Sequence, residues 1–165
     1  MADIEWTVDA LGSRIEAFLD PVLDAADLDL EYDIFTVDRS EKDIGPEIAV
    51  DFDGDDTSLL LQRRGELLLS LEQLTVEALR IPHHDRHRLL FDVNEYRMVR
   101  IDELCLTANK AAEQVIRTGK RFTFQPMTSR ERRIVHISLR GYDSITTFSE
   151  GVPPNRYTVI ETKRD

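Results

Sequence analysis

The sequence MTSRERRIVHISLRGYDSITTFSEGVPPNR, residues 127–156, decides how the rest of the chain is interpreted. We expect it to form a helix followed by a hairpin of strands. Thr128 can cap the helix N-terminus with its side-chain oxygen, and Glu131, three residues later, completes a capping box. At about 100° per residue this helix is amphipathic, with one basic side and one apolar side.

The basic side of the predicted helix collects residues of one sign. They are Arg130, Arg132, Arg133, His136 and Arg140. The other side carries Ile134, Val135, Ser138 and Leu139, and Ile137 lies near the basic side. From Arg117 to Arg140, seven residues are Lys or Arg and one, Glu131, is acidic. A charged helix face is usually solvated surface, but a face of one sign repels itself, which favours a role in binding an anionic partner.

The charge of the chain is unevenly distributed. Its 165 residues carry a formal net charge of −11. Residues 1–60 hold 18 acids and 3 bases, a net of −15, whereas residues 61–165 hold 14 acids and 18 bases, a net of +4. Such asymmetry is expected when an acidic part is joined to an anion-binding part. The acidic part could equally serve only to keep the protein soluble.

Several protein classes are not expected because the sequence lacks their features. No apolar run approaches the ~20 residues that span a bilayer. Residues 1–6, MADIEW, lack the basic start and apolar region of a signal peptide. Cys105 is the only cysteine, which argues against a disulfide framework. We therefore expect a cytoplasmic protein that does not insert into a membrane.

Enzymatic and metal functions are not expected either. The sequence contains no phosphate-binding loop signature and no nucleophile in a recognisable setting. His83, His84 and His87 lie beside Asp85, but Pro82 indicates a turn there, and no cysteine completes a zinc site. We therefore expect no bound metal and no cofactor.

Hydrophobic periodicity predicts an α+β fold. The first part should contain a helix at Thr7–Ala26 interrupted at Pro21, strands at 28–34 and 48–52, helices at 58–61 and 66–80, and a strand at 86–93. The second part should contain a helix at 95–118, a strand at 122–124, the helix after Thr128, and strands at 145–148 and 156–160. We expect two domains, 1–94 and 95–165.

Two of the predicted helices have a well-defined apolar stripe. In helix 66–80 the stripe is Leu68, Leu71, Leu74, Thr75 and Ala78. In helix 95–118 it is Ile101, Leu104, Ala108, Ala111, Ala112 and Val115. The polar segment 39–46 should connect the first two strands as a hairpin loop.

A second basic site is predicted at Gln62-Arg63-Arg64-Gly65, between two helices. The N-terminus of the following helix offers free N–H groups to a phosphate, and Gly65 lets the backbone approach a ligand closely. Arg63 and Arg64 add positive charge. These properties suit the capture of a nucleic acid strand.

This loop resembles the GxxG loop of a KH domain, and the predicted order helix–strand–strand–helix–helix–strand is similar to the type II version of that fold. The second part resembles an R-3-H domain, with Arg132 and His136 as its Arg and His. The segments FDVNEYR (91–97), SEG (149–151) and PNR (154–156) add to the resemblance. Over roughly residues 10–162, the chain resembles the bacterial Jag family, also called KhpB, in which these two domains are paired.

The resemblance implies a non-enzymatic protein that binds RNA or single-stranded DNA and acts as a post-transcriptional regulator linked to cell division or envelope growth. Arg132, Arg133 and Arg140 would then hold phosphates, and His136 would contact a phosphate or base, or orient Arg132. The path would include Arg130, Lys120, Arg121 and Arg156, and the loop residues Arg63, Arg64 and Gly65 would take a second part of the strand.

The chain departs from the family pattern at two places. Gln62 replaces the first glycine of GxxG, and its side chain can obstruct the approach of a strand. An acidic sheet also lies beside this loop, so the first domain could bind weakly or serve only a structural role. Arg132 and His136 should therefore matter more than Arg63 and Arg64. The family often has an additional N-terminal domain, for which we expect this chain to have no room.

A different function is open. The acidic first 60 residues could serve as the binding surface of a protein-interaction adaptor, for a basic partner or as a mimic of nucleic acid. Another small KH protein, or a second copy of the chain, is a further possible partner.

Overall fold

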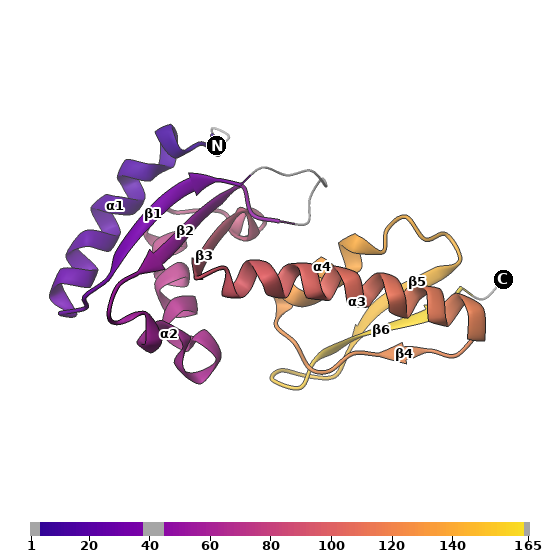
Figure 1. Cartoon of the computed structure of the whole chain (residues 1–165). Coiled ribbons are helices and arrows are strands. Elements are labelled where there is room, and N and C mark those ends of the chain that lie inside the picture. Colours follow the sequence, from indigo (N-terminus) through magenta and orange to yellow (C-terminus); the bar gives the residue numbers. More distant parts are fainter. Residues whose placement is uncertain (1–3, 38–44, 164–165) are drawn as a thin grey trace. The chain divides into compact units, whose positions relative to one another are not determined.

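The computed structural model describes residues 4–37 and 45–163. The chain divides into two compact units, Met1–Met98 and Val99–Asp165 (Figure 1). Each unit has its own three-stranded sheet, and helices accompany both sheets, in agreement with the α+β class predicted from the sequence. The loop predicted at 39–46 lies largely outside the described residues. None of the described helices is long and apolar enough to cross a membrane.

The first unit contains α1 (Val8–Ala25), β1 (Glu31–Thr36), β2 (Ile48–Asp53), α2 (Thr57–Ala78), the 3-10 helix η1 (Arg86–Arg88) and β3 (Leu89–Val93). The strands lie in the order β1-β2-β3, with β1 antiparallel and β3 parallel to β2. Helix α1 contacts β1, α2 contacts β3, and the two helices contact each other, so they cover the same face of the sheet. The core lies between this face and the helices.

Apolar side chains that alternate along β2 form the part of this core that belongs to the sheet. Ile48, Val50 and Phe52 of β2 are at most 1 % exposed, and the rings of Phe52 and Phe91 lie 5.4 Å apart. The strand predicted at 86–93 begins later, because residues 86–88 form η1. All five residues of β3 are buried, Leu90 and Asp92 included. The sequence pattern did not indicate that both faces of this strand are covered.

Helix α1 begins at a cap in which the backbone N–H of Ala10 donates to Thr7 Oγ1 at 3.2 Å. Of the two interruptions predicted at Pro21, a kink or a restart at Asp20, the restart is wrong, because one helix continues through Pro21 to Ala25. A proline lacks the N–H that would bond four residues back. Leu19 and Leu23, on either side, are both buried in the same core, which keeps the two halves of the helix together.

The predicted stripe of α2 is correct only in part. Leu68, Leu71 and Thr75 are buried, but Leu74 is 53 % exposed and Ala78 is also exposed. At about 100° per residue, Leu74 lies about 120° from Leu68, outside the face that meets the sheet. The buried face is completed by Val76 and by Leu79, just after the helix.

The second unit contains most of α3 (Tyr96–Thr118), then β4 (Phe122–Thr123), α4 (Ser129–Ser138), β5 (Ile145–Glu150) and β6 (Tyr157–Thr162). Its sheet has the order β4-β6-β5, with both pairs antiparallel. The predicted stripe of α3 is confirmed, since all of its residues are buried: Ile101, Leu104, Ala108, Ala111, Ala112 and Val115. The helix ends before Gly119, whose φ of 68° suits glycine.

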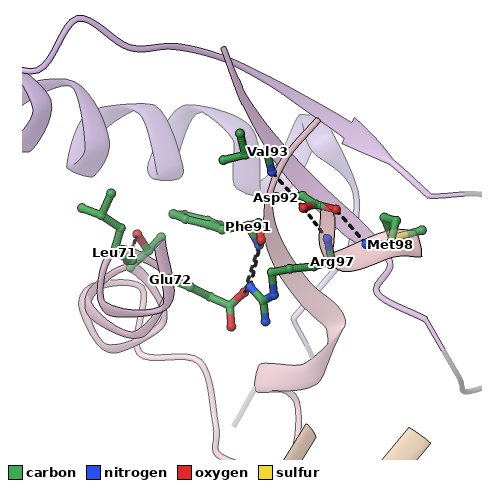
Figure 2. A network of polar contacts seen from close by, with 8 residues as sticks. Leu71, Glu72, Phe91, Asp92, Val93, Arg97 and Met98 are labelled. Carbon is green, nitrogen blue, oxygen red and sulfur yellow. Dashed lines mark hydrogen bonds and ion pairs between the residues drawn. The ribbon is translucent and has the colours of Figure 1, made fainter. Parts of the chain in front are cut away.

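A buried polar network fastens the first turn of α3 to the sheet of the first unit (Figure 2). Asp92 is 2 % exposed, and its carboxylate accepts the backbone N–H groups of Val93, Arg97 and Met98 at 2.8–2.9 Å. Glu72 Oε2 accepts the N–H of Phe91 at 2.9 Å and pairs with Arg97 Nη1 at 2.6 Å. The carboxylate of Asp92 thereby satisfies helix N–H groups that have no partner within the helix. The FDVNEYR segment therefore has a structural role.

Candidate nucleic-acid interface

The basic helix α4 starts as the sequence predicts. Thr128 Oγ1 accepts the N–H of Glu131 at 3.2 Å, and Glu131 Oε2 accepts the N–H of Thr128 at 2.8 Å, which is a complete capping box. The helix contacts β5 and β6. Ile137, which the wheel placed near the basic side, is 8 % exposed and belongs to the core. Arg140 lies in the turn after the helix, so it does not share the helix face with Arg132.

The guanidinium of Arg132 is held in place by hydroxyl groups. Its Nη1 donates to Ser149 Oγ at 3.1 Å, and its Nη2 donates to Ser129 Oγ at 2.7 Å. Ser129 opens α4 and Ser149 lies on β5, so the two contacts come from different elements. Because hydroxyls are neutral, they orient the guanidinium without cancelling its charge.

His136, one turn later, has both ring nitrogens occupied. Nδ1 is hydrogen-bonded to Thr147 Oγ1 at 2.8 Å and Nε2 to Ser149 Oγ at 3.2 Å. Burial lowers the pKa of His136, and the positive charge of Arg132 lowers it further, so the ring is neutral at pH 7. A half-buried neutral ring with two internal hydrogen bonds is not arranged to bind a phosphate. Of the roles predicted for His136, the geometry favours the orientation of Arg132 through Ser149.

Arg156 joins this cluster from the residue that precedes β6. Burial lowers the pKa of Arg132, and the nearby charge of Arg156 lowers it further. The Nε atoms of both arginines are buried without a hydrogen-bond partner, and neither guanidinium pairs with a carboxylate within the part of the chain that the structure describes. Two adjacent cations without a counter-charge are electrostatically unfavourable unless an anion binds between them. We call Arg132, Arg156, Ser149 and His136 the arginine cluster.

The remaining residues predicted for this path have different surroundings. Arg121 Nη2 pairs with Glu150 Oε2 at 3.0 Å, so part of its charge is compensated. Lys120, Arg133 and Arg140 are exposed, and Arg130 is half-buried. Of the residues predicted for this path, the structure therefore brings Arg132, His136 and Arg156 together.

The loop Gln62–Gly65 interrupts α2 with non-helical backbone. Arg63, Arg64 and Gly65 have φ values of 51°, 65° and 79°, the left-handed region that costs an L-residue about 1–2 kcal/mol. A Cβ on Gly65 would meet only Leu60 O, at 3.8 Å, so glycine is needed there for its φ and not for space. Gln62 has φ −60° and ψ 151°, an ordinary conformation. The glutamine in place of glycine therefore causes no backbone strain.

The side chains of this loop are less constrained than those of the arginine cluster. Gln62, Arg63 and Arg64 are exposed. Arg63 forms one surface pair with Glu66 at 3.7 Å, in which the side chains are 84 % and 65 % exposed. Exposed pairs of this kind contribute little.

Sequence reasoning missed the hydroxyl groups that organise the arginine cluster. Ser149 and Thr147 lie two residues apart on β5, so they point to the same face of the sheet. Ser149 was recognised as part of the SEG segment, but no role was assigned to it. A signal was available, since Thr147 lies in the strand predicted at 145–148 and Ser149 follows it directly, close in sequence to a basic helix. In the described ranges 4–37 and 45–163, no three His, Cys, Asp or Glu side chains are arranged to hold a metal ion.

The chain is similar to a known domain family and to named bacterial proteins. The R-3-H domain family matches residues 103–162, which include α4 and the whole arginine cluster. A Bacillus subtilis protein named RNA-binding protein KhpB is 37 % identical over 131 residues, which make up 78 % of this chain and 61 % of the relative. A protein of the same name from Clostridium symbiosum is 32 % identical over 161 residues, 95 % of this chain and 68 % of the relative. A third, from Streptococcus pneumoniae, is 26 % identical over 161 residues, 98 % of this chain and 47 % of the relative.

Proposed function

The chain belongs to the KhpB family, and from this premise we propose that it is a non-enzymatic protein that binds RNA. The proposal is supported by the names of its relatives in three bacteria, each an RNA-binding protein. It is also supported by the match of residues 103–162 to the R-3-H domain family. The chain spans 61 % of the length of the B. subtilis relative, so the activity of a whole relative is here a proposal for this chain.

The single observation that carries the proposal is the uncompensated pair Arg132 and Arg156. Their buried Nε atoms have no hydrogen-bond partner among the described residues, and their charges repel. An RNA phosphate is an anion with several acceptor oxygens, and guanidinium groups bind it well. We infer that a phosphate lies between these two side chains, with Ser149 and His136 holding Arg132 in position.

The surrounding basic residues would extend the path of the strand. Arg130, Arg133, Arg140, Lys120 and Arg121 would contribute long-range attraction to further phosphates. We propose that the first unit is a type II KH domain whose Gln62–Gly65 loop contacts a second part of the strand through Arg63, Arg64 and Gly65. The exposed side chains of the loop support a weaker and less specific contact there.

The wider role expected from the family is likewise a proposal. It comprises post-transcriptional regulation linked to cell division or envelope growth, binding of single-stranded DNA beside RNA, and pairing with another small KH protein or a second copy. The cytoplasmic location expected from the sequence also stays a prediction.

A salt titration of binding to a fluorescein-labelled single-stranded RNA tests the function. For single strands, the slope of log K against log salt is about −0.7 for each phosphate contact. Arg132→Ala should weaken binding at low salt by about tenfold or more, as expected for a charge-assisted contact, and reduce the slope by about one contact. Arg117→Ala, which removes an exposed charge from the last turn of α3, is the matched control and should change little. Absence of binding at low salt, or equal losses in the two variants, would contradict the function.

The alternative adaptor function is favoured by one feature of the first sheet. Glu31 lies opposite Asp53, and Asp33 opposite Asp51, on neighbouring strands. Like charges in direct register are destabilising, and burial followed by the charge of Asp92 raises the pKa of Asp51. A basic protein partner would relieve this repulsion. Pull-downs after nuclease treatment distinguish the two functions, because only an adaptor should retain partners that depend on Asp33 and Asp53.

A further inference from the structure

A cavity of about 250 Å³ opens in the second unit, and no part of the proposed function uses it. Leu104 and Phe124, which are 3 % and 7 % exposed, form its apolar floor. Phe122 and Met127 are half-buried and form its sides. The rim is polar and exposed, with Arg100 and Thr107 from α3 and Gln125 from the segment after β4.

An apolar floor with a polar rim suits a flat ring that has polar edges. Phe122 and Phe124 meet edge to face, with centroids 5.1 Å apart and an interplanar angle of 79°. The amide of Gln125 can both donate and accept a hydrogen bond, as the edge of a nucleobase requires. Cavities for drug-sized ligands measure about 300–1,000 Å³, so a slightly smaller cavity has room for one base.

Two hydrogen bonds link residues that line the cavity to the arginine cluster or to a chain neighbour of it. Met127, on its side, donates its N–H to the carbonyl of Arg156 at 3.0 Å. Arg100, on its rim, donates from Nε to Glu131 Oε1 at 3.1 Å, and Glu131 immediately precedes Arg132. Arg156 is therefore hydrogen-bonded directly to a residue of the cavity wall, and Arg132 is the chain neighbour of a residue that pairs with the rim.

We propose that this cavity binds one nucleobase of the RNA strand whose phosphate lies between Arg132 and Arg156. The inference deepens the proposed function and rests on it. RNA-binding proteins commonly splay out the bases of single strands and stack them on aromatic or guanidinium groups. Arg100 is held at the rim by Glu131 and by Glu103, whose Oε2 lies 3.3 Å from Nη1, so its guanidinium is oriented before a ligand arrives.

The test compares two RNA probes on the full chain: a labelled hexamer of adenosine, and a hexamer of the same backbone without bases. Thr107→Phe places a ring over the mouth of the cavity from an exposed position of α3. It should weaken binding of the adenosine hexamer about tenfold, the loss expected for one stacked base, and leave the abasic hexamer unaffected. Gln114→Phe, also exposed on α3 and outside the cavity lining, is the matched control and should leave both probes unaffected.

A second pair of variants guards against misfolding. Gln125→Ala removes a rim amide outside the helices and strands, and it should weaken only the adenosine hexamer, by about threefold, compared with Gln114→Ala. The inference is overturned if Thr107→Phe and Gln125→Ala bind the adenosine hexamer as the unmodified chain does, or if both probes lose affinity equally. If the unmodified chain binds neither probe at low salt, the proposed function fails as well.

Discussion

The arginine cluster and the Gln62–Gly65 loop present two arginines each, but by different physical means. In the cluster, the side chains are packed against a sheet, and Ser129 and Ser149 fix the guanidinium of Arg132. In the loop, the backbone is constrained by left-handed φ values while the side chains of Arg63 and Arg64 are exposed. A preorganised cation loses less conformational entropy on binding than a mobile one. We therefore expect the arginine cluster to bind an anion more tightly than the loop, although each carries two arginines.

The largest expected effect is on stability, and it differs between Gly151, near the arginine cluster, and Gly65, in the loop. A Cβ on Gly151, in the hairpin that leads to Arg156, would lie 2.8 Å from Asn155 O, whereas one on Gly65 has ordinary contacts. Both have positive φ. Gly151→Ala should therefore lower the free energy of unfolding by about 2–4 kcal/mol, and Gly65→Ala by about 1–2 kcal/mol. Chemical denaturation of each variant measures this. Equal losses would show that the backbone contact at Gly151 relaxes without cost.

The next effect concerns the hydroxyl that joins His136 to Arg132. Ser149→Ala removes a hydrogen bond to each, so Arg132 should lose its orientation and RNA affinity should fall about tenfold. Fluorescence anisotropy with a labelled single-stranded RNA measures the loss.

Thr146→Ala is the control for Ser149→Ala, because Thr146 is also half-buried on β5 but alternation turns it to the other face. It should leave affinity unchanged. An unchanged affinity for Ser149→Ala itself would mean that Arg132 needs no support from β5.

A smaller effect is expected at the loop. The double substitution Arg63→Ala with Arg64→Ala should reduce RNA affinity by no more than about threefold, because both side chains are exposed and their charges are screened. The same anisotropy assay, at the salt concentration used for Arg132→Ala, allows a direct comparison. A loss as large as that of Arg132→Ala would reverse the ranking of the two sites.

The smallest effect is the pH dependence of the cluster. The pKa of His136 is lowered from its ordinary value of 6.5 in the folded protein. Below about pH 6.5 the unfolded chain therefore binds more protons at His136 than the folded protein does. The stability contributed by the neutral ring is lost as the pH falls. The stability of the protein relative to His136→Gln should decrease between pH 7.5 and 5, as followed by denaturation.

The His136→Gln variant serves as the reference because Asp51 acts in the opposite sense at lower pH. The pKa of Asp51 is raised, so the folded state binds more protons there. That contribution is common to both proteins and cancels in the difference. A difference independent of pH would indicate that the ring nitrogens are not confined to their neutral form.

Much of the fold was predictable because it follows from local rules. Three features depend on residues close in sequence. They are the capping box at Thr128 and Glu131, the buried stripe of α3 and the alternation of side chains along β2. Prediction failed where a distant element decides. Leu74 is exposed because it lies outside the face of α2 that meets the sheet, and Ile137 is buried because α4 contacts β5 and β6.

For the candidate site, the sequence by itself determined which residues carry charge, where α4 begins and that two segments of the chain are basic. The left-handed backbone at Arg63, Arg64 and Gly65 was not predicted, because two of these three residues are not glycine. Only the tertiary structure decided that Arg156 lies beside Arg132 and that β5 hydroxyls occupy both nitrogens of His136. These contacts join residues 11 to 24 positions apart, and their geometry depends on how the sheet and helix pack together, which local patterns do not encode.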